Sequence, residues 1–304
     1  MNRPETATVT MTAHVSSPIS TPSSLTPPMA DPRRREASRR RRVLEAIAFV
    51  AVWVAAGYLL PLDANGYLLL GIPLTAGFQT LVRRRPLREL FAAGTTRFHL
   101  GARGLALGAA LAVVPGYHAV QAASTGDLTL LGWYLAAVIG AFCAAFALRA
   151  GSVRAALRSA ALPIAIGGGG MALVLGTVHV VTGTPLSPQA LATFATSVAL
   201  YLPATFLLEE VAFRGALDAH VHHDGEARGW LSAVAVSALW GLWHLPVSGG
   251  LGLPFPLLLV ELVVVHVLIG VPLSFAWRRT RTLAGPALAH AAIDAVRNAF
   301  VLGL

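Results

Sequence analysis

The sequence has no lysine, a single cysteine and few charged residues of either sign. Charged residues make up 12% of the 304-residue chain, about half of the roughly 25% typical of soluble domains, which argues against a water-soluble enzyme. Cys143 lies inside an apolar run, so no intramolecular disulfide is possible and redox chemistry is not expected. Hydrophobic residues account for 55% of the chain and gather into long runs. The sequence therefore predicts an all-α, polytopic transmembrane helical bundle.

The number of spans follows from the length of the apolar runs. About 20 residues suffice to cross the hydrocarbon core, and nine runs approach or exceed that length. Because run boundaries are uncertain by several residues, we expect about eight to nine spans. The runs are 43–60, 65–82, 100–118, 128–148, 160–181, 191–217, 230–247, 257–277 and 283–303.

The basic residues predict the orientation of the chain and exclude one class of partner. All 23 are arginines, and they give a net charge of +9. They form short clusters between apolar runs rather than a continuous basic surface, so nucleic acid is not an expected partner. All but Arg214 and Arg297 lie on the N-terminal tail or on alternate connections. The positive-inside rule then predicts a multi-pass protein of the plasma membrane with a cytoplasmic N-terminus and an external C-terminus.

Composition divides the chain into three parts. Residues 1–42 are rich in Ser, Thr and Pro and end in arginines, which predicts a disordered cytoplasmic tail. Residues 43–190 form generic N-terminal transmembrane spans. Residues 191–304 differ because their apolar runs contain several ionisable side chains. An ionisable group in the hydrocarbon region costs on the order of 3 kcal/mol or more, so each of these side chains needs an explanation.

The first ionisable cluster is Glu209, Glu210 and Arg214. Glu210 and Arg214 are four residues apart on one helical face, which predicts a structural ion pair. Glu209 points about 100° away and has no cation of its own. A second buried carboxylate of this kind is the leading candidate for a general base.

Two further clusters place histidines inside apolar runs. Trp240 precedes His244 by four residues, so the indole can pack beside the imidazole and fix its ring. His290 precedes Asp294 by four residues, and such a carboxylate orients an imidazole and selects its tautomer. Pairing of Asp294 with Arg297 is the structural alternative.

The depths of Glu209, His244 and His290 along their runs overlap. We therefore expect the three side chains to meet in one cavity, within the cytoplasmic half or near the midplane, reached from the cytoplasmic side. Two other features of the sequence are better explained by structural roles than by a role in binding or catalysis. The run 167–170 of four glycines suits close helix packing or a local break, and the histidine-rich loop 215–228 suits a solvated connection better than a metal site.

The three clusters together resemble a known family signature. They read Glu209-Glu210-x-x-x-Arg214, Trp240-x-x-x-His244 and His290-x-x-x-Asp294, on separate runs in that order. This pattern resembles the CPBP family, the CAAX-protease and bacteriocin-processing family of intramembrane endopeptidases. Its motifs are Glu-Glu-x-x-x-Arg, Phe-x-x-x-His and His-x-x-x-Asn or His-x-x-x-Asp. The resemblance covers about the last 100 residues, so 191–304 is predicted to be a CPBP-like catalytic core.

The resemblance implies a glutamate-dependent peptidase acting on a membrane-anchored or membrane-proximal polypeptide. Glu209 with His244 would activate a water molecule, and His290 with the residue at 294 would stabilise the oxyanion. Family members have also been described as metalloproteases, and Glu209, His244 and His290 would then be ligands of a divalent metal such as zinc. No His-Glu-x-x-His motif is present, so the sequence leaves this choice open.

Two residues depart from the family pattern, and two other functions remain as alternatives. Trp240 replaces phenylalanine and is expected to change little. Asp294, when ionised, would repel an oxyanion, so an orienting role toward His290 is favoured. The alternatives are a non-catalytic membrane interaction or bacteriocin-immunity protein and, with less support, a proton-coupled transporter, neither of which would cleave peptides.

Overall fold

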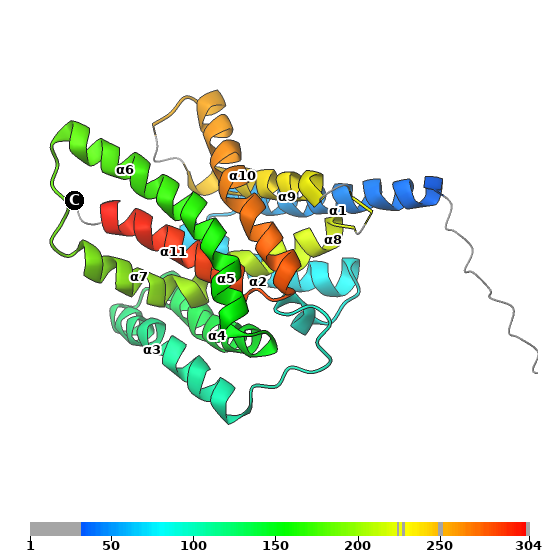
Figure 1. Ribbon diagram of the computed structural model, residues 1–304, viewed down its shortest axis with the longest axis horizontal. Coiled ribbons are helices and arrows are strands. Elements are labelled where there is room, and N and C mark those ends of the chain that lie inside the picture. Colours follow the sequence, from blue (N-terminus) through cyan, green and yellow to red (C-terminus); the bar gives the residue numbers. More distant parts are fainter. Residues whose placement is uncertain (1–31, 224, 227–228, 249–251, 302–304) are drawn as a thin grey trace, which may run out of the picture.

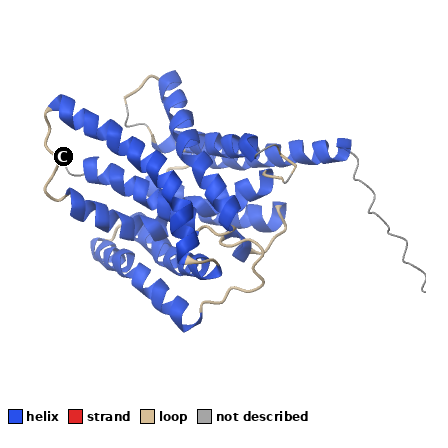
Figure 2. Ribbon diagram, in the orientation of Figure 1, coloured by secondary structure: helices blue, strands red, loops and turns tan. Residues whose placement is uncertain are grey.

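The computed structural model describes residues 32–301 except 224, 227–228 and 249–251. Within these residues all regular secondary structure is helical and no strand is formed, as predicted (Figures 1 and 2). The α-helices are α1 (Pro32–Leu59), α2 (Ala64–Gly77), α3 (Gly101–Thr125), α4 (Leu128–Ala150), α5 (Val153–Pro163), α6 (Gly169–Thr182), α7 (Ala190–Thr205), α8 (Ala219–Val221), α9 (Trp230–Trp243), α10 (Phe255–Thr280) and α11 (Ala284–Val301). Short π- and 3₁₀-helical segments are η1 (Phe78–Val82), η2 (Leu87–Leu90), η3 (Ile164–Gly168), η4 (Phe206–Asp218) and η6 (Leu245–Val247).

All nine predicted runs correspond to helices, but not all of them have the properties of a span. In the described part of the chain, 7 helical stretches are long and apolar enough to cross a membrane. They are 38–59, 101–125, 128–150, 153–182, 190–221, 230–247 and 255–280. Helices α2 and α11 are not among them. α11 is amphipathic and lies within the bundle against α7, α5 and α10, so neighbouring helices take the place of lipid around most of it (Figure 1).

The first helix begins earlier than predicted. The expected disordered tail ended at residue 42, whereas α1 begins at Pro32. Arginine is a good helix former, and Arg41 Nε contacts Glu45 Oε1 at 2.8 Å one turn later, which favours continuation of the helix toward the N-terminus. Residues 1–31 of the predicted tail lie outside the described residues.

Polar side chains fix several helix starts at the membrane boundary. Asp63 accepts a hydrogen bond from the Gly66 amide at 2.7 Å at the start of α2. Asp127 likewise accepts one from the Leu130 amide at the start of α4. At α9, Glu226 Oε1 accepts from the Ser232 amide at 2.6 Å. These contacts satisfy amide groups that a helix leaves unpaired in its first turn.

Prolines precede two of the changes in helical winding. Pro163 directly precedes η3, and Pro203 lies in the last turn of α7 before η4. Because proline has no N–H, it removes a hydrogen bond from the regular ladder, and a π-helical register is one way to re-pair the backbone. The glycine run follows Pro163, and a Cβ on Gly167 would lie 2.5 Å from the Ile293 side chain. Close packing is therefore observed at Gly167, whereas the helix continues through the glycine run with a change to π-helical winding instead of a break.

A cluster of aromatic side chains holds η4 in place. Trp53 of α1 stacks on Phe213 of η4 and lies edge-on to Trp243 of α9. Its indole N–H donates to the Tyr67 carbonyl at 3.0 Å, and the Tyr67 hydroxyl donates to the Trp243 carbonyl at 2.7 Å. These contacts join α1, α2, η4 and α9, the elements on one side of the ionisable cluster.

The histidine-rich loop is shorter than predicted. Residues 215–221 belong to η4 and α8, and His220 Nε2 lies 2.8 Å from Glu45 Oε2 on α1. His220 therefore pairs between helices rather than lying in a solvated connection.

Candidate active site

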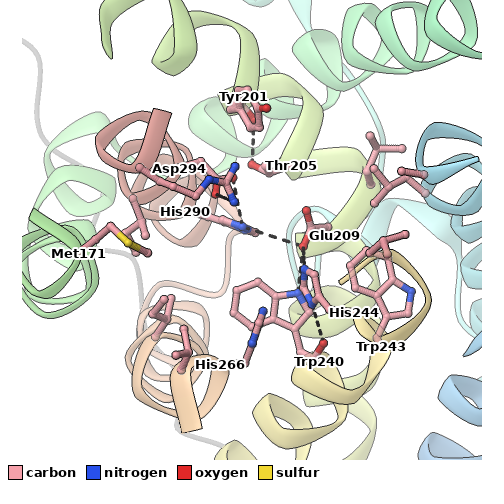
Figure 3. A pocket seen from close by; sticks show the side chains of 18 of the residues that line it. Met171, Tyr201, Thr205, Glu209, Trp240, Trp243, His244, His266, His290 and Asp294 are labelled. Atoms are coloured by element: carbon pink, nitrogen blue, oxygen red, sulfur yellow. Dashed lines mark hydrogen bonds and ion pairs between the residues drawn. The ribbon is translucent and has the colours of Figure 1, made fainter. Parts of the chain in front are cut away.

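The ionisable cluster lies where η4, α9, α10 and α11 meet (Figure 3). The Glu209-Glu210-x-x-x-Arg214 motif is wound as a π-helix, a rare form that often marks functional sites. Close backbone contacts hold its neighbours: a Cβ on Gly215 would lie 2.3 Å from the Leu90 carbonyl oxygen, and one on Gly241 would lie 2.4 Å from that of Leu262. Only glycine permits these approaches without a backbone shift.

Glu209 lies between the two predicted histidines. Its Oε2 is 4.0 Å from His244 Nε2 and 4.0 Å from His290 Nε2. His244 Nδ1 lies 3.0 Å from the Trp240 carbonyl oxygen. A carbonyl only accepts, so Nδ1 carries the proton and the Nε2 of neutral His244 presents a lone pair toward Glu209. The structure thus brings together the three residues that the sequence predicted to meet.

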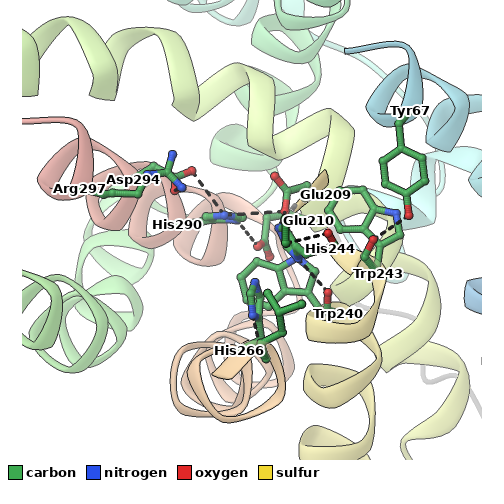
Figure 4. Close-up of polar contacts among 12 residues, drawn as sticks. Tyr67, Glu209, Glu210, Trp240, Trp243, His244, His266, His290, Asp294 and Arg297 are labelled. Carbon is green, nitrogen blue, oxygen red and sulfur yellow. Dashed lines mark hydrogen bonds and ion pairs between the residues drawn. The ribbon is translucent and has the colours of Figure 1, made fainter. Parts of the chain in front are cut away.

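Glu210 contacts His290 (Figure 4), and it also contacts its predicted partner Arg214. Its Oε1 accepts from His290 Nδ1 at 2.8 Å and from Arg214 Nη1 at 3.3 Å. The Glu210 and Arg214 side chains are both fully buried. Their pairing was predicted from the spacing, whereas the contact with His290 was not. Glu210 therefore fixes the tautomer and direction of the His290 ring.

Trp240 does more than replace the family phenylalanine. Its indole N–H donates to Glu209 Oε2 at 2.9 Å, a hydrogen bond that phenylalanine cannot make. Its ring also lies 4.3 Å from the Arg214 guanidinium and 5.0 Å from the His290 ring. The expectation that tryptophan changes little did not include this contact between the indole N–H and the candidate base.

Asp294 lies at the edge of the cluster. Its Oδ2 is 3.5 Å from His290 Nε2, and its Oδ1 is 3.3 Å from Arg297 Nη1. Both contacts predicted as alternatives are present together. The hydrogen bond that orients His290 nevertheless comes from Glu210, and Asp294 supplies a nearby negative charge.

Two ionisable side chains of α10 also line the site and were missed from the sequence. The His266 ring lies 4.2 Å from that of His244 and meets the Trp240 ring edge-on at 4.6 Å. Glu261 lies just over one turn earlier, and its Oε2 is buried without a hydrogen-bond partner among the described residues. Their presence in an otherwise apolar run was the available signal.

These side chains line a cavity of about 460 Å³. Besides Glu209 and the histidines, its lining includes Asn65 at the start of α2, Val247 after α9 and Arg297 in the second half of α11. These three positions lie toward the connections that have no arginine. Under the positive-inside orientation, the cavity extends toward the non-cytoplasmic side, which differs from the cytoplasmic access expected from the sequence. The difference arises because His244 lies at the far end of α9 from the connection 222–229, which is cytoplasmic under this orientation.

The distances also test the zinc alternative. In a tetrahedral zinc site with bonds of about 2.0 Å, ligand atoms lie about 3.3 Å apart. The two separations of 4.0 Å from Glu209 Oε2 exceed that spacing. A water molecule with hydrogen bonds of about 2.8 Å spans such a gap without movement. No group of three or more His, Cys, Asp or Glu side chains within the described ranges is arranged to hold a metal ion.

Comparison with known proteins agrees with the motifs. Residues 191–296 match the family model described as type II CAAX prenyl endopeptidase Rce1-like. No curated protein and no solved structure gives a significant match to the chain. The matched residues contain η4, α9, α10 and most of α11, and with them all the side chains of the three motifs. Residues 191–296 of this multi-pass membrane protein are therefore similar to the type II CAAX prenyl endopeptidase family, in agreement with the three motifs.

Proposed function

We propose that this protein is an intramembrane endopeptidase in which Glu209 activates a water molecule. The observation that carries the proposal is the position of Glu209 Oε2, which faces the Nε2 atoms of His244 and His290 at 4.0 Å in a cavity within the bundle. These gaps fit one bound water in hydrogen-bond contact with all three side chains. The substrate is a membrane-anchored or membrane-proximal polypeptide that enters the cavity in extended form.

The reaction begins with proton transfer from the water to Glu209. The resulting hydroxide forms a bond to the scissile carbonyl carbon, and the carbonyl π electrons move to the oxygen. His244 accepts a hydrogen bond from the water through Nε2 and sets its direction of attack. When the tetrahedral intermediate collapses, the C–N bond breaks and the proton on Glu209 passes to the leaving nitrogen. The products are a new amine and a new carboxylic acid, which releases its remaining proton to water and becomes a carboxylate.

His290 is the group best placed to stabilise the oxyanion. The Glu210 contact assigns one proton to its Nδ1, and Asp294 and Glu209 near its Nε2 favour a second proton there. The cationic ring then donates from Nε2 to the oxyanion. In this arrangement Asp294 balances the charge of His290 and does not touch the oxyanion.

The test is a comparison of peptide termini in membrane fractions of cells expressing wild type or Glu209→Gln at matched levels. Mass spectrometry should find new termini with wild type only, and the cleaved proteins would identify the substrate. Glu45→Gln is the matched control, since Glu45 is a carboxylate paired between helices outside the cavity. It should give the wild-type pattern of termini.

Two results would contradict the proposal. Identical termini with wild type and a folded, inserted Glu209→Gln protein would indicate a non-catalytic or transport role. Loss of cleavage on treatment with a membrane-permeant chelator, restored by zinc, would replace the direct water mechanism with a metal-dependent one.

A further inference from the structure

A second cavity lies at the arginine-rich end of the bundle. It has a volume of about 400 Å³ and lies away from Glu209 and the catalytic histidines. Charged side chains from three parts of the chain line it: the segment after η1, the end of η4 and the end of α10. They are Arg83, Arg85, Glu89, Asp218, Arg278 and Arg281. We refer to it as the arginine cavity.

The backbone around the arginine cavity is fixed by long-range hydrogen bonds. The Ala93 amide donates to the Arg281 carbonyl at 2.8 Å, and the Leu283 amide donates to the Phe91 carbonyl at 3.0 Å. Arg281 has a left-handed conformation with φ of 60°, unusual for a residue with a side chain, and its amide closes the end of α10. The cavity wall therefore holds its arginines on a defined backbone.

One of the four arginines is neutralised within the protein. Arg278 donates from Nε to Asp218 Oδ2 at 2.8 Å and from Nη2 to Asp218 Oδ1, a two-point ion pair. It also donates to the Gly229 carbonyl at 2.6 Å. With Asp218 occupied by Arg278, Glu89 is the one acidic side chain left in the described lining to balance Arg83, Arg85 and Arg281.

Arg83 is partly buried and has no anionic partner among the described residues. Its Nη1 donates to Gln79 Oε1 at 2.6 Å and to the Gly215 carbonyl at 2.8 Å, both neutral acceptors. Among the described residues no carboxylate oxygen lies within 4.0 Å of it, and no acceptor is found for Nε or Nη2, which are not fully enclosed. Burial lowers the pKa of Arg83 to about 10, with Glu89 opposing the shift from a distance. A partly buried guanidinium of this kind calls for a compensating anion.

We propose that the arginine cavity binds a phosphate group, with Arg83, Arg85 and Arg281 as the cationic contacts. Guanidinium groups bind phosphate oxygens in paired geometry, and basic pockets between helices at this membrane face bind anionic lipid headgroups. The cavity lies at the end of the bundle where the arginine-rich connections gather, which is the depth of phospholipid headgroups. Free phosphate is the other source of the same chemistry.

The experiment measures thermal unfolding of the full-length protein in detergent micelles. Increasing amounts of phosphatidylglycerol, phosphatidylcholine or inorganic phosphate are added at constant ionic strength. We expect stabilisation by phosphatidylglycerol and none by phosphatidylcholine. The Arg85→Gln/Arg281→Gln variant alters exposed side chains and spares Arg83, which holds Gly215. Its apparent affinity for phosphatidylglycerol should fall at least tenfold.

The control variant is Arg154→Gln/Arg158→Gln. It removes the same charge from exposed arginines at the same end of the bundle, outside the cavity lining, and should keep the wild-type response. Stabilisation by inorganic phosphate, lost in the cavity variant alone, would support the site and identify free phosphate as its ligand. No stabilisation by either anion, or equal losses in both variants, would overturn the proposal.

Discussion

Glu210→Gln tests the most deeply buried charge pair of the site. The substitution keeps the shape of the side chain and an oxygen that can accept from His290, but it removes the charge opposite Arg214. At the observed separation of 3.3 Å and an effective dielectric constant of about 20, the lost attraction is about 5 kcal/mol. The contact of Arg214 with the Trp240 ring offsets part of that loss. We expect a destabilisation of about 3 to 5 kcal/mol, the usual cost of breaking a buried pair.

A double-mutant cycle separates charge from shape. Arg214→Met alone should also destabilise, because it leaves Glu210 with His290 as its sole positive partner among the described residues. The double variant Glu210→Gln/Arg214→Met should lose clearly less than the sum of the two. The six tryptophans provide a fluorescence signal for unfolding in SDS and detergent mixed micelles. Glu45→Gln, at a partly exposed ion pair, should cost less than about 1 kcal/mol. Strict additivity, or a Glu210→Gln effect as small as that of Glu45→Gln, would refute the reasoning.

Three further substitutions test other contacts. Trp240→Phe removes the N–H that donates to Glu209 and should reduce the cleavage rate about tenfold while leaving the protein folded. The reason is that a hydrogen bond to a charged group contributes about 1.5 to 3 kcal/mol. An unchanged cleavage rate would show that the indole does not position Glu209. Gly215→Ala forces a Cβ against a backbone carbonyl and should cost about 1 to 3 kcal/mol in unfolding free energy, whereas Gly170→Ala, which has open space around its Cβ, should not destabilise. Burial raises the pKa of Glu226, but hydrogen bonds from the first turn of α9 outweigh it and hold that pKa below the usual 4.5. Glu226 therefore stabilises the fold above that pH, and the stability advantage of wild type over Glu226→Gln should be full at pH 7 and shrink as the pH falls below 4.5.

The sequence predicts the helices well because the signal for each is local. Apolar runs separated by arginine clusters give all nine segments, most with ends within a few residues of those observed. The meeting of Glu209, His244 and His290 also follows, since three isolated ionisable groups in hydrocarbon require shared partners. The start of α1 was not predicted because a cluster of arginines is compatible both with a disordered tail and with a helix.

The remaining features depend on contacts that sequence spacing does not encode. Glu210 and His290 are 80 residues apart, so their hydrogen bond depends on how η4 packs against α11. The π-helical winding of η4 changes which side chains share a face, and a regular helix is the default when reading a motif. His266 and Glu261 were the omissions with a local signal, because both interrupt an apolar run in the same way as His244.

Helix η4 borders both cavities, with Glu209 in the candidate active-site cavity and Asp218 in the arginine cavity. A ligand at one end that shifts this helix along its axis must alter the geometry at the other. Thermodynamic linkage requires the effect to be mutual: if a bound anion changes the affinity for a peptide by some factor, the peptide changes the affinity for the anion by the same factor. The two ligands would reach the protein from opposite sides of the membrane. Through this one helix, the lipid composition of one leaflet would then change the affinity for a peptide that binds from the other side.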